Sequence, residues 1–474
     1  MRKDYRNKEY RVDRMSELEK HKKYKAMYGS NEIFWGLGVE EETYFQFTKP
    51  IYVATPILRS NHKPERYSVD YYNSFKPYYT RSFDTIFPDK AGCIALPFFF
   101  NSHSFQKMDS SGQHVTTFEK EPQPNPKFSG KTFLEELQEF YPELFKDQKE
   151  YTFTFDGDTI EFMTQHFYRA TAKEVITELL EYKNRFLKKM NEYLSIKQIH
   201  TDKGLLEYPK QNPGFAIYYS NPANVAMFNS GTYHINITIP TNLGPKDGDK
   251  APEILNPELF VLQHKRCILL YQWLEPFLIA MYGTPDPLSN VSPIYTKSSQ
   301  RSAISRYIGI GTYDTSQMQM GKILTVPIEQ VRGSDQPFWW YTQYHKISGY
   351  RQLEKIGMDI NFRKHYNHGI ELRILDWFPE SRLEEVIELL VHVADVSLIR
   401  DEAREPVFSE TWNDLVVGVL QEGKKFRLTE TMVATYEKVF GTLLYGKDLT
   451  VEEAYYRIQK DMKNYTGPCS VAML

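Results

Sequence analysis

The chain has 474 residues, a formal net charge of −3 and charged residues of both signs along its length. This balance gives no general attraction to nucleic acid or to an anionic membrane, so we expect small or locally recognised partners. Its 3 cysteines (Cys93, Cys267 and Cys469) are too widely spaced for a disulfide framework or a zinc cluster, which indicates a reducing compartment. Without a bilayer-length apolar run or a secretory signal, the sequence predicts a cytoplasmic protein with no membrane partner.

The first third of the chain predicts an arm, a strand pair and a linker. Residues 1–30 are expected to form a charged, helical arm. The alternating pattern of residues 34–47 predicts the first core strand, with 51–58 as its hairpin partner. The proline-rich stretch 119–130 predicts a loop, followed by a helix over 132–140.

The middle of the chain predicts a hairpin and two long helices. Residues 151–164 read as two strands that turn at Asp156-Gly157, leaving Glu161 among apolar neighbours. Apolar residues at helical spacing predict helices over 172–194 and 259–282, the second buried on several sides.

From residue 382 the pattern is helical, and we interpret the end of the chain, from Cys469 onward, as a frayed terminus. The expected C-terminal helices span residues 383–399, 411–421, 430–445 and 451–462.

Four short strand-like segments place acidic, imidazole and guanidinium groups at alternate positions. Successive side chains of a strand point to opposite faces, so each alternate pair shares one face of its strand and the groups can converge. The segments are Gly38-Val39-Glu40-Glu41-Glu42, Ile160-Glu161-Phe162, Tyr233-His234-Ile235-Asn236-Ile237 and Ile370-Glu371-Leu372-Arg373.

Carboxylates crowded on one sheet face repel one another unless cations lie between them. Oxygen-rich ligation with one imidazole favours Mg²⁺ or Mn²⁺, usually carried by a nucleotide. We expect Arg373 to stabilise negative charge on a transferred phosphoryl group. No phosphate-binding glycine loop is present, so metals and arginines would hold the phosphates. The predicted metal ligands are Glu40, Glu42, Glu161, His234 and Glu371.

Simpler interpretations stand beside this one. The acidic pair of the first strand could be a solvated strand end, and His234 could be a hydrogen-bonded core histidine. Glu371 and Arg373 could form a cross-strand ion pair. His365 and His368 with Glu371 have a spacing found in zinc sites, but no thiol or further histidine is near them.

The four segments resemble motifs of the glutamate-cysteine ligase family and its carboxylate-amine ligase relatives, within the glutamine synthetase-like superfamily. Residues 38–42 match an opening G-[IV]-E-x-E strand whose two alternate glutamates ligate different metal ions. Residues 160–164 are similar to an L-E-F-I-T segment that supplies another ligand, and 230–236 to a glycine-led strand that supplies a histidine. Residues 370–376 resemble E-[VL]-R-x-[LI]-D, with a glutamate ligand and a phosphate-binding arginine. The matches follow family order over residues 34–380.

Two further segments extend the resemblance. Residues 281–285 are similar to an F-G-A-S-P turn, and 299–302 to the segment that supplies an arginine to the substrate carboxylate, with Arg301 preferred over Arg306. Asn236 joins Arg373 as an expected nucleotide contact. The chain departs from the family in the Tyr- and Phe-rich stretch over 50–150, and an acid expected before Glu161 falls on Asp156 or Asp158.

The resemblance implies an ATP-dependent ligase. ATP phosphorylates a substrate carboxylate, and an amine attacks the acyl phosphate to give an amide, with glutamate and cysteine as the first pair to try. The alternatives are another amino acid, a protein side chain, or a nucleotide-binding relative without turnover. The implied α+β fold has a curved, mainly antiparallel sheet backed by helices. It divides the chain into the arm (1–30), a catalytic domain (31–380) and a helical region packed on it (381–474).

Overall fold

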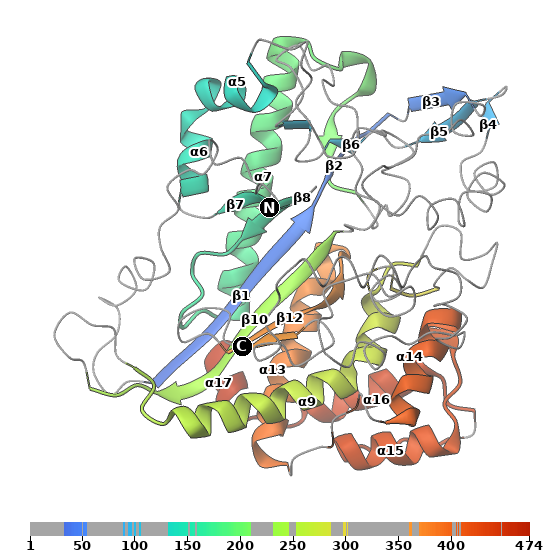
Figure 1. Ribbon diagram of the computed structural model, residues 1–474. Coiled ribbons are helices and arrows are strands. Elements are labelled where there is room, and N and C mark those ends of the chain that lie inside the picture. The colour runs from blue at the N-terminus through green and yellow to red at the C-terminus, as the bar shows by residue number, and fades with distance from the viewer. Residues whose placement is uncertain are drawn as a thin grey trace, which may run out of the picture.

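The computed structural model combines one large sheet with helices and two small sheets (Figure 1). It describes residues 33–49, 51–54, 89–90, 93–96, 99–100, 104–105, 131–149, 152–156, 159–209, 231–245, 253–285, 297–299, 301, 360–362, 369–400, 404, 406, 409–446 and 448–474. The predicted arm (1–30) and the predicted proline-rich loop (119–130) lie outside these residues.

The large sheet has 6 strands, and every neighbouring pair is antiparallel. Strands far apart in the sequence lie side by side in this sheet. The expected combination of helices with a mainly antiparallel sheet is confirmed. In spatial order the strands are β11 (Ile360–Phe362), β12 (Ile370–Asp376), β10 (Thr232–Asn242), β1 (Ile33–Thr43), β8 (Thr159–Met163) and β7 (Phe153–Asp156).

Strand β1 has one apolar face and one face divided between glycine and acid. Its odd-numbered residues Leu37 and Val39 are fully buried in the main core. On the other face, Gly36 and Gly38 leave room for the ring of Phe167, since an added Cβ would lie 2.0 Å and 2.7 Å from ring atoms. The aromatic ring covers the glycine half, and the acidic half that follows builds the candidate site.

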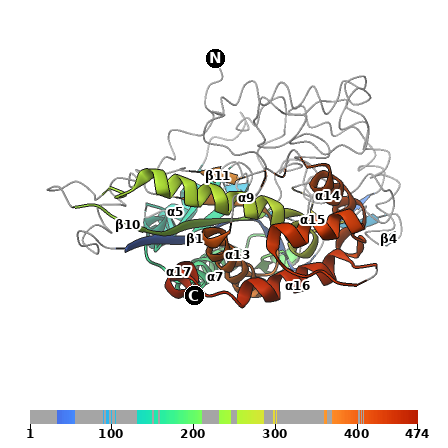
Figure 2. The ribbon, with the colours of Figure 1, turned by 90° about the horizontal axis from the view of Figure 1, so that it is seen from below.

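Long helices pack against this sheet. Helix α7 (Ala172–Lys197) begins at a capping box and contacts β1 and β8, while α9 (Pro257–Tyr282) runs against β10 and β12. Helix α13 (Leu383–Ile399) contacts both long helices and β10. Figure 2 shows α7 and α13 on one side of the sheet. The predicted helices over 172–194, 259–282 and 383–399 are confirmed, and most of α9 is buried as expected.

Shorter helices complete the fold. The predicted helix over 430–445 is too long, because Gly441 adopts a positive φ of 64° and ends the helix at Phe440. The helices over 132–140, 411–421 and 451–462 are confirmed to within a residue at each end. The structure has α5 (Phe133–Phe140), α6 (Pro142–Lys149), α14 (Glu410–Glu422), α15 (Glu430–Phe440), α16 (Val451–Lys463) and the 3₁₀ turns η2 (Thr201–Lys203), η5 (Glu380–Arg382) and η7 (Gly423–Lys425).

The prediction of a frayed C-terminus is wrong. Residues Pro468–Met473 form helix α17, in which Cys469 and Met473 are fully buried. The buried carboxylate of Asp395 on α13 accepts hydrogen bonds from the backbone N–H groups of Gly467, Cys469 and Ser470. A carboxylate beside the first turn of a helix accepts hydrogen bonds from backbone N–H groups that have no partner within the helix. Asp395 does this for α17 and so fixes the C-terminal residues to the core.

The predicted hairpin between residues 34–47 and 51–58 is also wrong. Both edges of β1 are already paired, with β10 on one side and β8 on the other. The chain after β1 instead joins two small sheets. One contains β2 (Phe45–Phe47), β6 (Phe99–Phe100) and β9 (Leu206–Glu207), and the other β3 (Ile51–Ala54), β5 (Cys93–Leu96) and β4 (Asp89–Lys90).

The predicted hairpin over residues 151–164 is confirmed. Strands β7 and β8 pair in antiparallel register, from Phe153 opposite Phe162 to Asp156 opposite Thr159, so two residues connect them. Within the described residues, no helix combines the length and apolar character needed to cross a membrane. Helices beyond residue 383 share one hydrophobic core with the sheet, and the division of the chain into domains stays a prediction.

Candidate metal centre

Strand register brings the predicted acids together on one face of the large sheet. On the central strand β1, Glu40 lies opposite His234 of β10, and Glu42 lies opposite Glu161 of β8. On the far side of β10, Asn236 lies opposite Glu371 of β12. Directly opposed residues of antiparallel strands share a face, so four separate segments contribute to one cluster.

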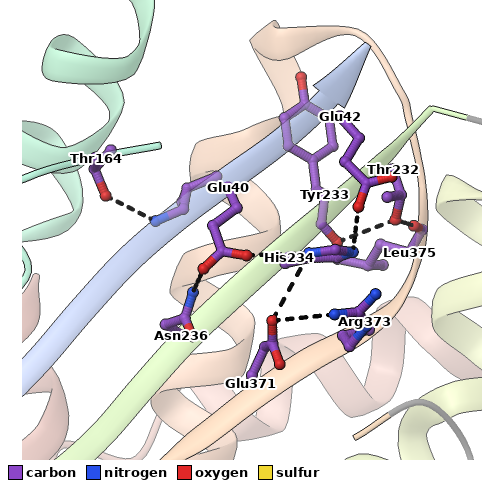
Figure 3. Close-up of polar contacts among 11 residues, drawn as sticks. Glu40, Glu42, Thr164, Thr232, Tyr233, His234, Asn236, Glu371, Arg373 and Leu375 are labelled. Carbon is purple, nitrogen blue, oxygen red and sulfur yellow. Dashed lines mark hydrogen bonds and ion pairs between the residues drawn. The ribbon is translucent and has the colours of Figure 1, made fainter. Parts of the chain in front are cut away.

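The first triad consists of Glu40, His234 and Glu371 (Figure 3). The imidazole Nδ1 lies 3.2 Å from Glu40 Oε2 and 3.8 Å from Glu371 Oε1. One potential ligand atom from each residue lies within 4.8 Å of the others. His234 and Glu371 are almost fully buried, and Glu40 is half-buried. This spacing suits one cation held by two carboxylates and one nitrogen.

The second triad consists of Glu42, Glu161 and the same histidine. Its ligand atoms also lie within 4.8 Å of one another, and His234 Nε2 is 3.6 Å from Glu42 Oε1. The two ring nitrogens therefore face different triads. In a neutral imidazole one nitrogen has a free lone pair, so that nitrogen can ligate one ion while the N–H of the other donates a hydrogen bond to the neighbouring carboxylate.

Two polar side chains border the first triad. Asn236 Nδ2 donates a hydrogen bond to Glu40 Oε1 over 3.3 Å, and Arg373 Nη1 lies 3.4 Å from Glu371 Oε1. The pairing of β10 with β12 shifts by one residue at this point, so Arg373 and Ile374 together oppose His234. Bulges of this kind re-aim side chains beside functional sites.

The ion-pair interpretation of Glu371 and Arg373 is confirmed as a contact, although the pair lies within one strand and does not cross strands. The interpretation of the acidic pair as a solvated strand end is wrong, because Glu42 is only 5% exposed. The role of Glu371 as a metal ligand stays a prediction.

The cluster concentrates negative charge in a buried place. Glu42, Glu161 and Glu371 are each less than a tenth exposed, and Glu40 lies beside them. Burying several carboxylates together is costly unless a cation compensates them. Carboxylate oxygens with a single imidazole suit Mg²⁺ or Mn²⁺ better than softer metals.

Comparison with known proteins gives one informative match. The chain is 36% identical over 440 residues to Uncharacterized protein R704 of Acanthamoeba polyphaga mimivirus, an alignment that covers 92% of this chain and 76% of that protein. The chain belongs to the family of that mimivirus protein. No family model matches the chain. Because the name of the relative states no activity, the chemistry must be argued from the site.

Arg301, the predicted substrate-binding arginine, lies at the end of the same sheet face. Its backbone N–H donates a hydrogen bond to Asp376 Oδ1 over 2.9 Å. Asp376 on β12 lies opposite Thr232 on β10, and Thr232 lies opposite Glu42 on β1. Burial raises the pKa of Asp376 to about 6, although hydrogen bonds from Arg301, Ser299 and Thr284 oppose the shift. Four other residues considered from sequence lie outside the described residues: Asp158, Arg306, His365 and His368.

The sequence reasoning missed a buried ion pair behind the acid face. Glu41 points to the face opposite Glu40 and Glu42, and its Oε1 lies 2.7 Å from the Nζ of Lys183 on α7, with both side chains fully buried. The Nε1 of Trp377, just after β12, donates to the same oxygen over 2.7 Å. Burial raises the pKa of Glu41, and the Lys183 ammonium opposes that shift.

Thermal unfolding should reveal the balance between repulsion and cation binding. In a chelator, Glu161→Gln is expected to unfold at a higher temperature than the unchanged protein, because it removes one of the crowded charges. With Mn²⁺ at 100 times its dissociation constant, the unchanged protein should gain about 2.7 kcal/mol, and the variant clearly less.

The matched control is Glu181→Gln, an exposed carboxylate on α7. It should follow the unchanged protein both with chelator and with Mn²⁺. An equal Mn²⁺ response in Glu161→Gln and Glu181→Gln would contradict the assignment of Glu161 as a ligand.

Proposed function

We propose that the protein is an ATP- and Mg²⁺-dependent carboxylate-amine ligase with a glutamine synthetase-like sheet, acting on amino acids in the cytoplasm. The first substrates to test are glutamate as the carboxylate and cysteine or a similar amino acid as the amine. The observation that carries the proposal is the division of one acid-rich sheet face into two triads that share His234.

The division agrees with what the sequence resemblance implies. In the ligase family the two alternate glutamates of the opening strand serve different metal ions, and here Glu40 belongs to one triad and Glu42 to the other. The glutamates of the segments at Glu161 and Glu371 likewise fall in different triads.

Bound divalent ions would neutralise the β- and γ-phosphate oxygens of ATP and favour attack by a carboxylate. The chain's own residues supply the rest. Arg373 borders the first triad, where its guanidinium is suited to negative charge on the transferred group. Asn236 holds Glu40 in place through its amide. No covalent intermediate on the protein is needed, so both buried cysteines that the structure describes, Cys267 and Cys469, have no part in the reaction.

The experiment is Mg²⁺-dependent release of ADP from ATP, with L-glutamate alone, with L-glutamate and L-cysteine, and with a panel of other amino acids. We expect ADP release to need both a carboxylate and an amine, and to stop when Mg²⁺ is chelated. Mass spectrometry of the product then identifies the pair. Mg²⁺-dependent release that is unaffected by any amino acid would contradict the ligase proposal.

A further inference from the structure

Asp376, the last residue of β12, is a buried carboxylate whose two oxygens hold two separate segments of the chain. Its Oδ1 accepts the backbone N–H of Arg301 over 2.9 Å, and its Oδ2 accepts the backbone N–H of Thr284 over 3.1 Å. The side chain of Ser299 forms another hydrogen bond with it. The residue is 1% exposed, so these bonds form away from water, where losing a partner is costly.

The two segments also pack tightly against each other. An added Cβ at Gly283, the residue that follows α9, would lie 2.9 Å from the Cα of Ser299. The Thr284 hydroxyl donates to the backbone oxygen of Trp377 over 3.1 Å, which ties the same turn to the chain just beyond β12. The turn after α9 and the segment that carries Arg301 thus meet at one anchor.

This anchor lies on the face that carries the acid triads. Asp376 is opposite Thr232 on β10, and Thr232 is opposite Glu42 on β1. Two strand spacings separate Asp376 from Glu42, which is about 10 Å. The anchor therefore lies near enough to the second triad to belong to the same site.

We propose that Asp376 is a positioning residue that fixes the backbone at Arg301, so that this guanidinium meets the α-carboxylate of an amino acid substrate. The inference rests on the proposed ligase function and adds the substrate end of the same site. It places the contact with the substrate carboxylate beside the turn after α9, where the Arg301 backbone is anchored. Arg301 itself is half-buried there.

The test is Asp376→Asn in the full chain. An asparagine offers one oxygen in place of two, and its neutral amide is a weaker acceptor than a carboxylate, so the hydrogen bond from the Arg301 backbone N–H is weakened or lost. We expect the KM for the carboxylate substrate to rise about 10- to 100-fold, the range that loss of a charged hydrogen bond produces. The kcat should change less than about 3-fold, and the affinity for Mn²⁺ with nucleotide should stay the same, because the triads are intact.

Thr284→Val is the matched control. It removes a hydroxyl hydrogen bond from the same turn and leaves both Asp376 oxygens with their backbone partners. It should lower stability without raising that KM. A parallel loss of kcat, substrate affinity and nucleotide affinity in Asp376→Asn would reduce Asp376 to a structural residue and overturn the proposal.

Amide hydrogen exchange separates this inference from the ligase proposal. The Arg301 amide should exchange faster in Asp376→Asn than in the unchanged protein, and not in Thr284→Val. That outcome would support the anchor even if no ADP were released with any amino acid, a result that would count against the ligase. Unchanged Arg301 exchange in Asp376→Asn would overturn the anchor whatever the activity.

Discussion

Replacing Lys183 with methionine is expected to lower the free energy of unfolding by about 3–5 kcal/mol, the cost of leaving a buried charge without its partner. The Lys183 ammonium contacts Glu41 and Glu380, and neither Lys183 nor Glu41 is exposed. Its loss would leave the Glu41 carboxylate in the core without that cation, although the Trp377 indole N–H would still donate to it. The destabilisation therefore originates on the face behind the acid triads.

Urea unfolding followed by circular dichroism measures this effect. Lys188→Met serves as the control, because Lys188 is exposed on the same helix and should change stability by less than about 0.5 kcal/mol. The double variant Lys183→Met with Glu41→Leu should recover most of the loss, since a buried ion pair can often be replaced by apolar residues of similar size. A loss below about 1 kcal/mol in Lys183→Met would contradict the buried pair.

Glu42→Gln is expected to reduce Mg²⁺-dependent ADP release by about 10³-fold, comparable with removal of one preorganised electrostatic group from an active site. Glu42 is 5% exposed and belongs to the second triad with Glu161 and His234. A glutamine keeps the size of the side chain and removes its charge, so the loss would come from cation binding rather than from packing.

Glu181→Gln makes the same chemical change at an exposed position of α7 and should keep full activity. The two variants should unfold at similar temperatures in a chelator or with Glu42→Gln slightly higher, because one of the crowded charges is gone. Activity of Glu42→Gln within about 3-fold of the control would contradict a metal role for this residue.

Much of the candidate site could be predicted because strand alternation is a local property. Glu40 with Glu42, and His234 with Asn236, share a face by spacing alone. Sequence could not determine which strands become neighbours. The structure places β1 between β8 and β10, which moves residues 51–54 into a different sheet. Such long-range pairing depends on the whole core and leaves no local pattern.

The buried pair Glu41–Lys183 has a signal in the sequence. Three consecutive acids on a strand must place the middle one on the opposite face, which here is the apolar face. A cation must then lie in the apolar stripe of a covering helix, and Lys183 occupies that stripe between Leu179 and Phe186. Asp376 left a weaker signal, because its partners are backbone amides, which every sequence contains.

The central claim is that this sheet face holds two divalent ions beside a nucleotide. Counting Mn²⁺ ions bound per chain, by electron paramagnetic resonance with a non-hydrolysable ATP analogue, tests it most directly. We expect two ions in the unchanged protein and in Glu181→Gln, and fewer in Glu42→Gln. Mn²⁺ binding no greater than that of the ATP analogue without protein would contradict a site for two ions on this sheet face. Equal Mn²⁺ binding in all three proteins would contradict the role of Glu42 as a ligand.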